Sequence, residues 1–146
     1  MNEFDFLKSL LGSKFVNHLM KDGKKAKAER ILLKSLELIK KSGNPEPINV
    51  VVKALENVKP LVEVRSVRIG GSSYQIPVPL TKHRQYSLGI RWIIDSARKR
   101  NGYSMPEKLF DEFMDASKNQ GASVRRRVTL HKLADANRAF AHYRWY

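Results

Sequence analysis

The sequence of 146 residues contains no cysteine, which excludes disulfide bonds, cysteine-ligated zinc and cysteine nucleophiles. It also lacks an apolar run near the roughly 18 residues that span a bilayer. The Gly-x-Ser-x-Gly, G-x-G-x-x-G and P-loop signatures of hydrolases and nucleotide-binding proteins are missing. No metal-ligand spacing links the histidines to each other or to carboxylates; they are His18, His83, His131 and His142. These absences argue against an enzyme and against a cofactor or metal site.

Acidic residues are scarce beside basic ones. Lys and Arg number 28 against 14 Asp and Glu, for a net charge of +14. Positive charges in such excess repel one another, so a partner of opposite charge is expected. The steepest local excess lies in residues 62–100, which hold 8 basic and 2 acidic side chains. Nucleic acid is the first candidate partner. An anionic membrane is the second, but no predicted helix pairs a Lys-rich face with Trp or Phe opposite.

The length and the 42% apolar content predict a single domain spanning 1–146 with one hydrophobic core. Apolar residues recur at helical spacing, which predicts a mostly α class with about six helices and one β-hairpin at about 61–79. Ser13 is expected to cap the first helix, and Ser104-x-x-Glu107 is a capping box with Pro106 in the first turn. The expected helical segments are 13–23, 24–43, 48–59, 81–102, 104–121 and about 129 onward, after a short lead-in at 3–11.

The hairpin segment "VEVRSVRIGGSSYQIPVP" carries Arg65 and Arg68 close to its Gly70-Gly71 turn. On the way to this turn, its apolar side chains lie at even-numbered residues before Ser66 and at odd-numbered residues after it. A one-residue bulge there would restore a single apolar face and place both arginines on the same outward face. A basic two-stranded ribbon fits a nucleic-acid groove and neutralises phosphates. The alternative is a solvated edge hairpin with solubilising arginines.

Further basic clusters lie at helix ends or along one predicted helix. "KDGKKAK" forms a corner where backbone N–H groups and lysines attract anions, although a solvated turn explains it equally well. "KHR" and "RKR" bracket the segment 81–102 with Arg91 between them, which favours a phosphate track. "RRR" is expected just before the last helix, near its positive dipole end, where an external phosphate would relieve the charge. The tail "AFAHYRWY" suits base stacking or a C-terminal anchor, with Phe140 inward and Trp145 outward.

Several of these segments resemble the small-subunit ribosomal protein seven family, in its bacterial and organellar form. They are "KFVNHLMKDGKKAKAE", "ALENVKPLVEVRSVRIGGSSYQIPVPL", "IRWIIDSARKR", "SMPEKLFDEFMDASKNQG" and "HKLADANRAFAHYRW", which together run from about Lys14 to Trp145. The resemblance implies an all-helical bundle with a protruding β-hairpin and a structural, non-catalytic role. It also implies primary binding to the 3′ major domain of small-subunit ribosomal RNA, which nucleates assembly of the head.

The resemblance further implies which residues meet each partner. With Arg91 added from the phosphate track, the residues that would face ribosomal RNA are Lys24, Lys25, Arg65, Arg68, Lys82, His83, Arg84, Arg91, Arg98, Lys99, Arg100, Arg125, Arg126 and Arg127. Those expected beside the exit-site tRNA and the mRNA exit path are Gly70, Gly71, Ser72, Ser73 and Tyr74, with His142, Tyr143, Arg144 and Trp145. The C-terminal residues would also lie near platform protein eleven, and other head proteins would be neighbours.

Two features depart from the family pattern. The chain opens with the acidic "MNEFDF" where relatives usually carry a basic arm, which places the arm's RNA contacts in question here. Val128-Thr129 replaces an acidic pair, leaving Thr129 as a candidate cap and the "RRR" cluster uncompensated. The shortened start, the extra Tyr146 and the missing transit peptide favour an organelle-encoded, mitochondrial protein, with the bacterial cytoplasm or a plastid as alternatives.

The rival function is an architectural DNA-binding protein whose basic β-arm enters the minor groove. Such arms often carry a Pro or apolar wedge at the kink. The expected tip here, Gly-Gly-Ser-Ser, offers no wedge. This composition favours a probe laid against folded RNA.

Overall fold

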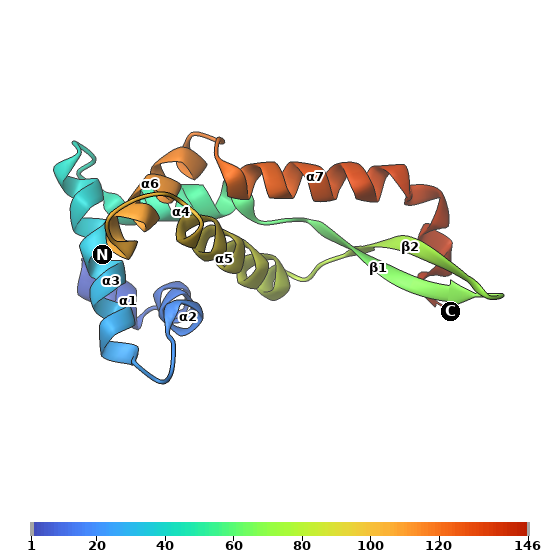
Figure 1. The fold of residues 1–146 in the computed structure, drawn as a ribbon, viewed down its shortest axis with the longest axis horizontal. Coiled ribbons are helices and arrows are strands. Elements are labelled where there is room, and N and C mark those ends of the chain that lie inside the picture. The colour runs from blue at the N-terminus through green and yellow to red at the C-terminus, as the bar shows by residue number, and fades with distance from the viewer. Residues whose placement is uncertain (1, 146) are drawn as a thin grey trace.

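Apolar residues at helical spacing gather most of the chain into a bundle, from which a β-hairpin and the last long helix project (Figure 1). The computed structural model describes residues 2–145, and the side chains of residues 2–141. The mostly α class with one protruding β-hairpin is confirmed. The elements are α1 (Glu3–Lys8), α2 (Leu10–Leu19), α3 (Lys25–Lys41), α4 (Pro47–Val58), β1 (Val62–Ile69), β2 (Ser72–Pro79), α5 (Lys82–Arg98), α6 (Met105–Ser117), α7 (Ala122–Ala136) and the 3₁₀ helix η1 (Arg138–Trp145).

The core of the bundle holds together the helices that carry the basic residues. α3 contributes Leu32, Leu36 and Ile39 from one stripe, and all three are fully buried. Phe15 of α2 meets Phe113 of α6 edge to face, with ring centroids 5.5 Å apart. Burying one such side chain contributes about 1.5–3 kcal/mol to stability. The core therefore fixes the relative positions of the surface cations.

The N-terminal segment divides into two helices at Ser9, which corrects the expectation of an N-cap at Ser13. The Ser9 hydroxyl accepts a hydrogen bond from the Gly12 N–H at 3.2 Å and begins α2, whereas Ser13 lies inside that helix. A Cβ on Gly12 would lie only 1.9 Å from the carbonyl oxygen of Phe6, so glycine is required there. This close approach folds α1 back on α2 and buries the Phe6 ring.

The last long helix begins at Ala122 and not near Thr129 as expected. The chain turns at Gly121, whose φ is 98°, and the buried carboxylate of Glu112 then accepts from both the N–H and the hydroxyl of Ser123. These bonds start the helix early. Thr129 is therefore an interior residue and no cap, and the "RRR" cluster lies inside the helix. After α7 the backbone continues as the 3₁₀ helix η1 and not as an α-helix to the end.

The N-terminus of α6 matches the sequence pattern only in part. Ser104 is the N-cap and Pro106 lies in the first turn, as expected. The Ser104 side chain makes no capping hydrogen bond within the described part of the chain. Its backbone carbonyl instead accepts the first helical bond, from the Lys108 N–H at 3.1 Å.

The two hairpin strands pair without interruption, from Val62 opposite Pro79 to Ile69 opposite Ser72. The predicted bulge at Ser66 is therefore wrong. Because successive side chains of a strand alternate between faces, Arg65 and Arg68 lie on opposite faces of the ribbon. The apolar positions switch parity because the ribbon is partly buried on both faces: residues 62 and 64 are half-buried on one, and residues 67 and 69 on the other.

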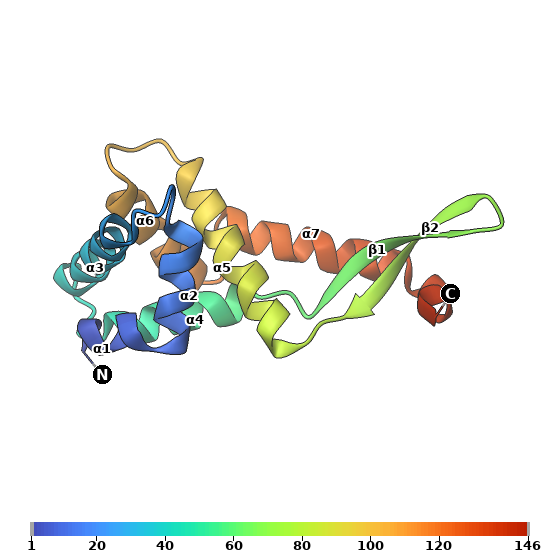
Figure 2. The same ribbon diagram turned by 90° about the horizontal axis from the view of Figure 1, so that it is seen from below.

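The hairpin runs beside the far part of α7 and ends in a tip that extends beyond it, as the two perpendicular views show (Figures 1 and 2). Ile76 of β2 is fully buried. Tyr74 lies against Phe140 of η1, with ring centroids 5.1 Å apart. The hairpin, α7 and η1 thus form a projecting arm. No helix within residues 2–145 combines the length and apolar character needed to cross a membrane.

Candidate nucleic-acid interface

Three arginines form a stripe along α5. Arg84, Arg91 and Arg98 are spaced seven residues apart, which is nearly two turns, so they share one helical face at steps of about 10.5 Å. Thr81 is the N-cap of α5, and its hydroxyl accepts a long hydrogen bond from the Arg84 N–H at 3.5 Å. Fully buried residues such as Ile93 hold the helix to the core. The packing of α5 therefore presents a straight row of cations.

Helix α2 adds further cations alongside this stripe. Nζ of Lys14 lies 2.8 Å from Nδ1 of His83. Because an ammonium group only donates, Nδ1 of His83 is the acceptor and its proton is on Nε2. Burial, Arg91 and Lys14 together hold the pKa of His18 below its usual value, with a smaller opposing effect from Asp95. We call Lys14, His83, Arg84, Arg91 and Arg98 the α2–α5 band.

The predicted lysine corner lies at one end of this band. The turn between α2 and α3 is made by Asp22 and Gly23, with φ of 54° and 73°. Lys24 and Lys25 follow at the start of α3 and are exposed. The guanidinium of Arg98 donates to the carbonyl of Leu19 at 3.4 Å, which holds the end of α5 against the end of α2. At the other end of α5, Lys82 is exposed in the first turn.

The basic clusters of α5 and α7, far apart in the sequence, converge on one carboxylate. Asp95 lies 4.0 Å from the guanidinium of Arg98 and 3.8 Å from that of Arg126. Arg126 also covers the Trp92 ring at 5.0 Å from its centroid. The expectation that the "RRR" cluster is uncompensated is wrong for Arg126, because Asp95 partly neutralises it. Sequence spacing gave no sign of this contact, since it depends on how α7 crosses α5.

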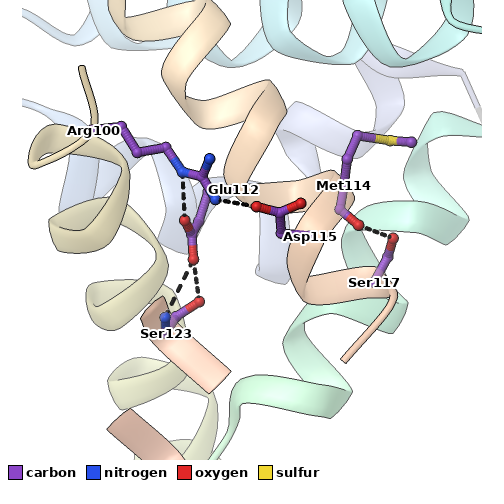
Figure 3. Close-up of polar contacts among 6 residues, drawn as sticks. All are labelled: Arg100, Glu112, Met114, Asp115, Ser117 and Ser123. Atoms are coloured by element: carbon purple, nitrogen blue, oxygen red, sulfur yellow. Dashed lines mark hydrogen bonds and ion pairs between the residues drawn. The ribbon is translucent and has the colours of Figure 1, made fainter. Parts of the chain in front are cut away.

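Arg100 differs from its neighbours because its guanidinium is bound by carboxylates of the same chain (Figure 3). It donates to Glu112 at 2.8 Å and to Asp115, both on α6. The Glu112 side chain is completely buried and also bonds Ser123 of α7. Arg100 thereby links the end of α5 to α6 and α7. It offers less to an external phosphate than the exposed Lys99 beside it.

The other two arginines of the "RRR" cluster, Arg125 and Arg127, have different neighbours. Arg125 is exposed near the Arg100–Asp115 pair, in a hollow that also includes Gln120. Arg127 is half-buried. Burial, and after it the charge of Arg127, lowers the pKa of His131, with Asp135 opposing. The three arginines therefore have different neighbours and do not make one contiguous patch.

The hairpin residues also occupy distinct positions. The tip turns at Gly70 and Gly71, with φ of 59° and 83°, and Ser72 and Ser73 are exposed beside them. Tyr74 is half-buried, since its ring lies against Phe140. Phe140 thus faces inward, as expected. The side chains of His142, Tyr143, Arg144 and Trp145 lie outside the described residues.

The hairpin arginines differ in their contacts. Arg65 donates to Glu63 at 2.8 Å, and the same carboxylate lies 3.7 Å from Arg84 at the start of α5. Arg68 is exposed near the tip. Glu63 therefore connects the base of the hairpin to the α2–α5 band. Within the part of the chain that the structure describes, no group of three or more His, Asp or Glu could hold a metal ion.

Comparison with known proteins gives one family. Its description is "Ribosomal protein S7p/S5e", and it matches residues 4–138. Three bacterial relatives are each named small ribosomal subunit protein uS7. That of Lacticaseibacillus casei is 49% identical over 137 residues, covering 94% of this chain and 88% of the relative. That of Vibrio atlanticus is 50% identical over 138 residues with the same coverage, and that of Xanthobacter autotrophicus is 49% identical over 133 residues, covering 91% and 85%.

Proposed function

The chain belongs to the Ribosomal protein S7p/S5e family, and we propose that it is the primary binder of the 3′ major domain of small-subunit ribosomal RNA, where it nucleates assembly of the head. As a member of this family, it is a structural constituent of the small ribosomal subunit, and its partners are small-subunit ribosomal RNA and ribosomal proteins. The family is structural and not enzymatic, which confirms the expected lack of a catalytic role.

The relatives bear on the expected location. They are bacterial proteins, so they give no support to the mitochondrial expectation, whereas the bacterial cytoplasm fits them. The location within the small ribosomal subunit follows from the family itself.

The observation that carries the RNA-binding proposal is the convergence of the cationic clusters of α5 and α7. Arg98 and Arg126 meet at Asp95, and the α2–α5 band extends from there along α5. A row of guanidinium groups at steps of about 10.5 Å can follow a phosphate backbone without reading base sequence. Lys24, Lys25, Lys99 and Arg125 extend the same surface in our proposal. Arg100 supports it indirectly, by fixing α5 to α6.

We assign the projecting arm a separate role. Its glycine tip, with the exposed Ser72 and Ser73, can approach a partner backbone closely, because it carries no bulky side chain. The tip and η1 end the same arm, which supports placing both beside the exit-site tRNA and the mRNA exit path, with platform protein eleven near the C-terminal segment. Arg65 and Arg68 would then contact RNA from opposite faces of the ribbon.

Competition binding tests the proposal against the DNA-binding alternative. The full chain is bound to a labelled transcript of the 3′ major domain and competed with unlabelled transcript or with duplex DNA of equal length. We expect the RNA to compete far better than the duplex at physiological salt. Equal competition would favour the architectural DNA-binding protein. Sedimentation of the tagged chain with small ribosomal subunits is the second readout. Absence of the chain from every small-subunit fraction would overturn the assignment.

A further inference from the structure

Tyr103 has the most exposed large hydrophobic side chain in the described part of the chain, with a relative exposure of 101%. It lies in the loop between α5 and α6, immediately after Gly102. A tyrosine that packs into a protein buries 150–250 Å². Tyr103 buries none of its ring against its own chain, so the fold gives no reason for an aromatic residue at this position.

Basic residues flank the loop that carries Tyr103 on both sides. The segment between the helices follows Arg98, which ends the arginine stripe of α5, and begins with the exposed Lys99. From α6, the side chain of Lys108 lies against Gly102, since a Cβ on that glycine would be 3.2 Å from Cγ of Lys108. Basic residues from the ends of two helices therefore lie next to this loop. Single exposed apolar residues are common, and this placement at the end of a phosphate track is what distinguishes Tyr103.

We propose that Tyr103 stacks on an unpaired nucleobase of small-subunit ribosomal RNA, next to phosphates held by Arg98 and Lys99. Sequence-tolerant stacking on aromatic rings is the usual way that proteins hold unstacked bases, and flanking cations neutralise the adjoining backbone. The inference rests on the proposed RNA-binding function and adds a contact that is not ionic. Because the phenol ring is uncharged, its contribution will not depend on salt in the way that the arginine contacts do.

Equilibrium binding to a transcript of the 3′ major domain, measured across a salt series, tests this stacking. We expect Tyr103→Ala to weaken binding roughly 5- to 100-fold at every salt concentration, with an unchanged slope of log K against log salt. Tyr103→Phe keeps the ring and should bind within about twofold of the native chain. Phe4→Ala is the matched control, because Phe4 is also a largely exposed aromatic, at 67%, but lies on α1 away from this loop.

Three results would overturn the inference. The first is a Tyr103→Ala affinity within about twofold of native, which would also be the result if the ring met a protein partner. The second is a Tyr103→Phe variant as weak as Tyr103→Ala, which would assign the effect to the hydroxyl. The third is an equal loss in Phe4→Ala. If the native chain prefers duplex DNA to the transcript, the proposed function itself fails and this inference with it. Unchanged thermal unfolding of Tyr103→Ala checks that the fold is intact.

Discussion

The backbone N–H of Leu61 donates a hydrogen bond to Nε2 of His131, 3.1 Å away. Leu61 precedes the first hairpin strand, and its carbonyl accepts from the N–H of Leu80 at 3.0 Å, just beyond the second strand. The bond to His131 thus ties the base of the hairpin to α7. Because Nε2 accepts, the imidazole must be neutral with its proton on Nδ1.

The first prediction is that His131 sets the direction of the hairpin. Since the chain has no native cysteine, spin labels can be placed at Ser72→Cys on the tip and Lys118→Cys on the bundle. We expect His131→Ala to broaden the distance distribution measured by double electron–electron resonance. His131→Gln retains an acceptor and should keep the native width. Equal widths for native and His131→Ala would show that this bond does not position the hairpin.

The second prediction concerns acid stability. The pKa values of His18 and His131 are held below the usual 6.5, in both cases first by burial and then by neighbouring cations. The unfolded chain therefore binds more protons than the folded chain as pH falls through about 6.5. The stability of the native fold is fully present above that pH and decreases below it. For His131 the neighbouring cation is Arg127, and only Asp135 raises the pKa. For His18 the neighbouring cations are Arg91 and Lys14, and only Asp95 raises the pKa.

Urea unfolding between pH 8 and pH 5 measures this dependence. We expect the midpoint to fall with decreasing pH in the native chain and to fall less in a double His18→Gln, His131→Gln variant. The window lies above the titration of ordinary carboxylates, so they contribute little to it. A native midpoint that is constant over this range would contradict the argument.

The third prediction is that Arg100 serves the fold more than the RNA. Arg100→Ala would leave the fully buried Glu112 without its cation, at a cost of about 3–5 kcal/mol in the free energy of unfolding. Arg125→Ala removes an exposed arginine near the same place and should cost less than about 0.5 kcal/mol. Urea unfolding measures both. Adding Glu112→Gln to Arg100→Ala should recover part of the loss, and equal stability of the two single variants would refute the assignment.

The fourth prediction concerns Asp95, which lies between two arginines of the proposed interface. Asp95→Asn removes a negative charge beside Arg98 and Arg126. We expect tighter binding to the 3′ major domain transcript at low salt and a steeper salt dependence, because both guanidinium groups become fully available to phosphates. Asp111→Asn makes the same charge change at an exposed site on α6 and should have a smaller effect. Equal effects of the two variants would show that only net charge matters.

The sequence predicted the fold class and most helices, because the apolar stripes of α3, α4, α5 and α6 have clear helical spacing. It misplaced the start of α7, since "RRR" interrupts any apolar face in that helix and the anchoring bond from Glu112 comes from another element. The bulge at Ser66 was wrong because alternation alone does not reveal that both faces of the ribbon are partly covered. The basic clusters could be found from charge alone, but their meeting at Asp95 required the packing of α7 on α5.

The salt dependence of RNA binding tests most directly the claim that the α5 stripe tracks phosphates. The triple variant Arg84→Gln, Arg91→Gln, Arg98→Gln should bind the 3′ major domain transcript more weakly and flatten the slope of log K against log salt by about 2–3. Lys34→Gln, Lys40→Gln, Lys53→Gln removes the same charge from exposed positions on α3 and α4 and should change the slope by less than about 1. A stripe variant whose affinity and slope match those of this control would contradict the account.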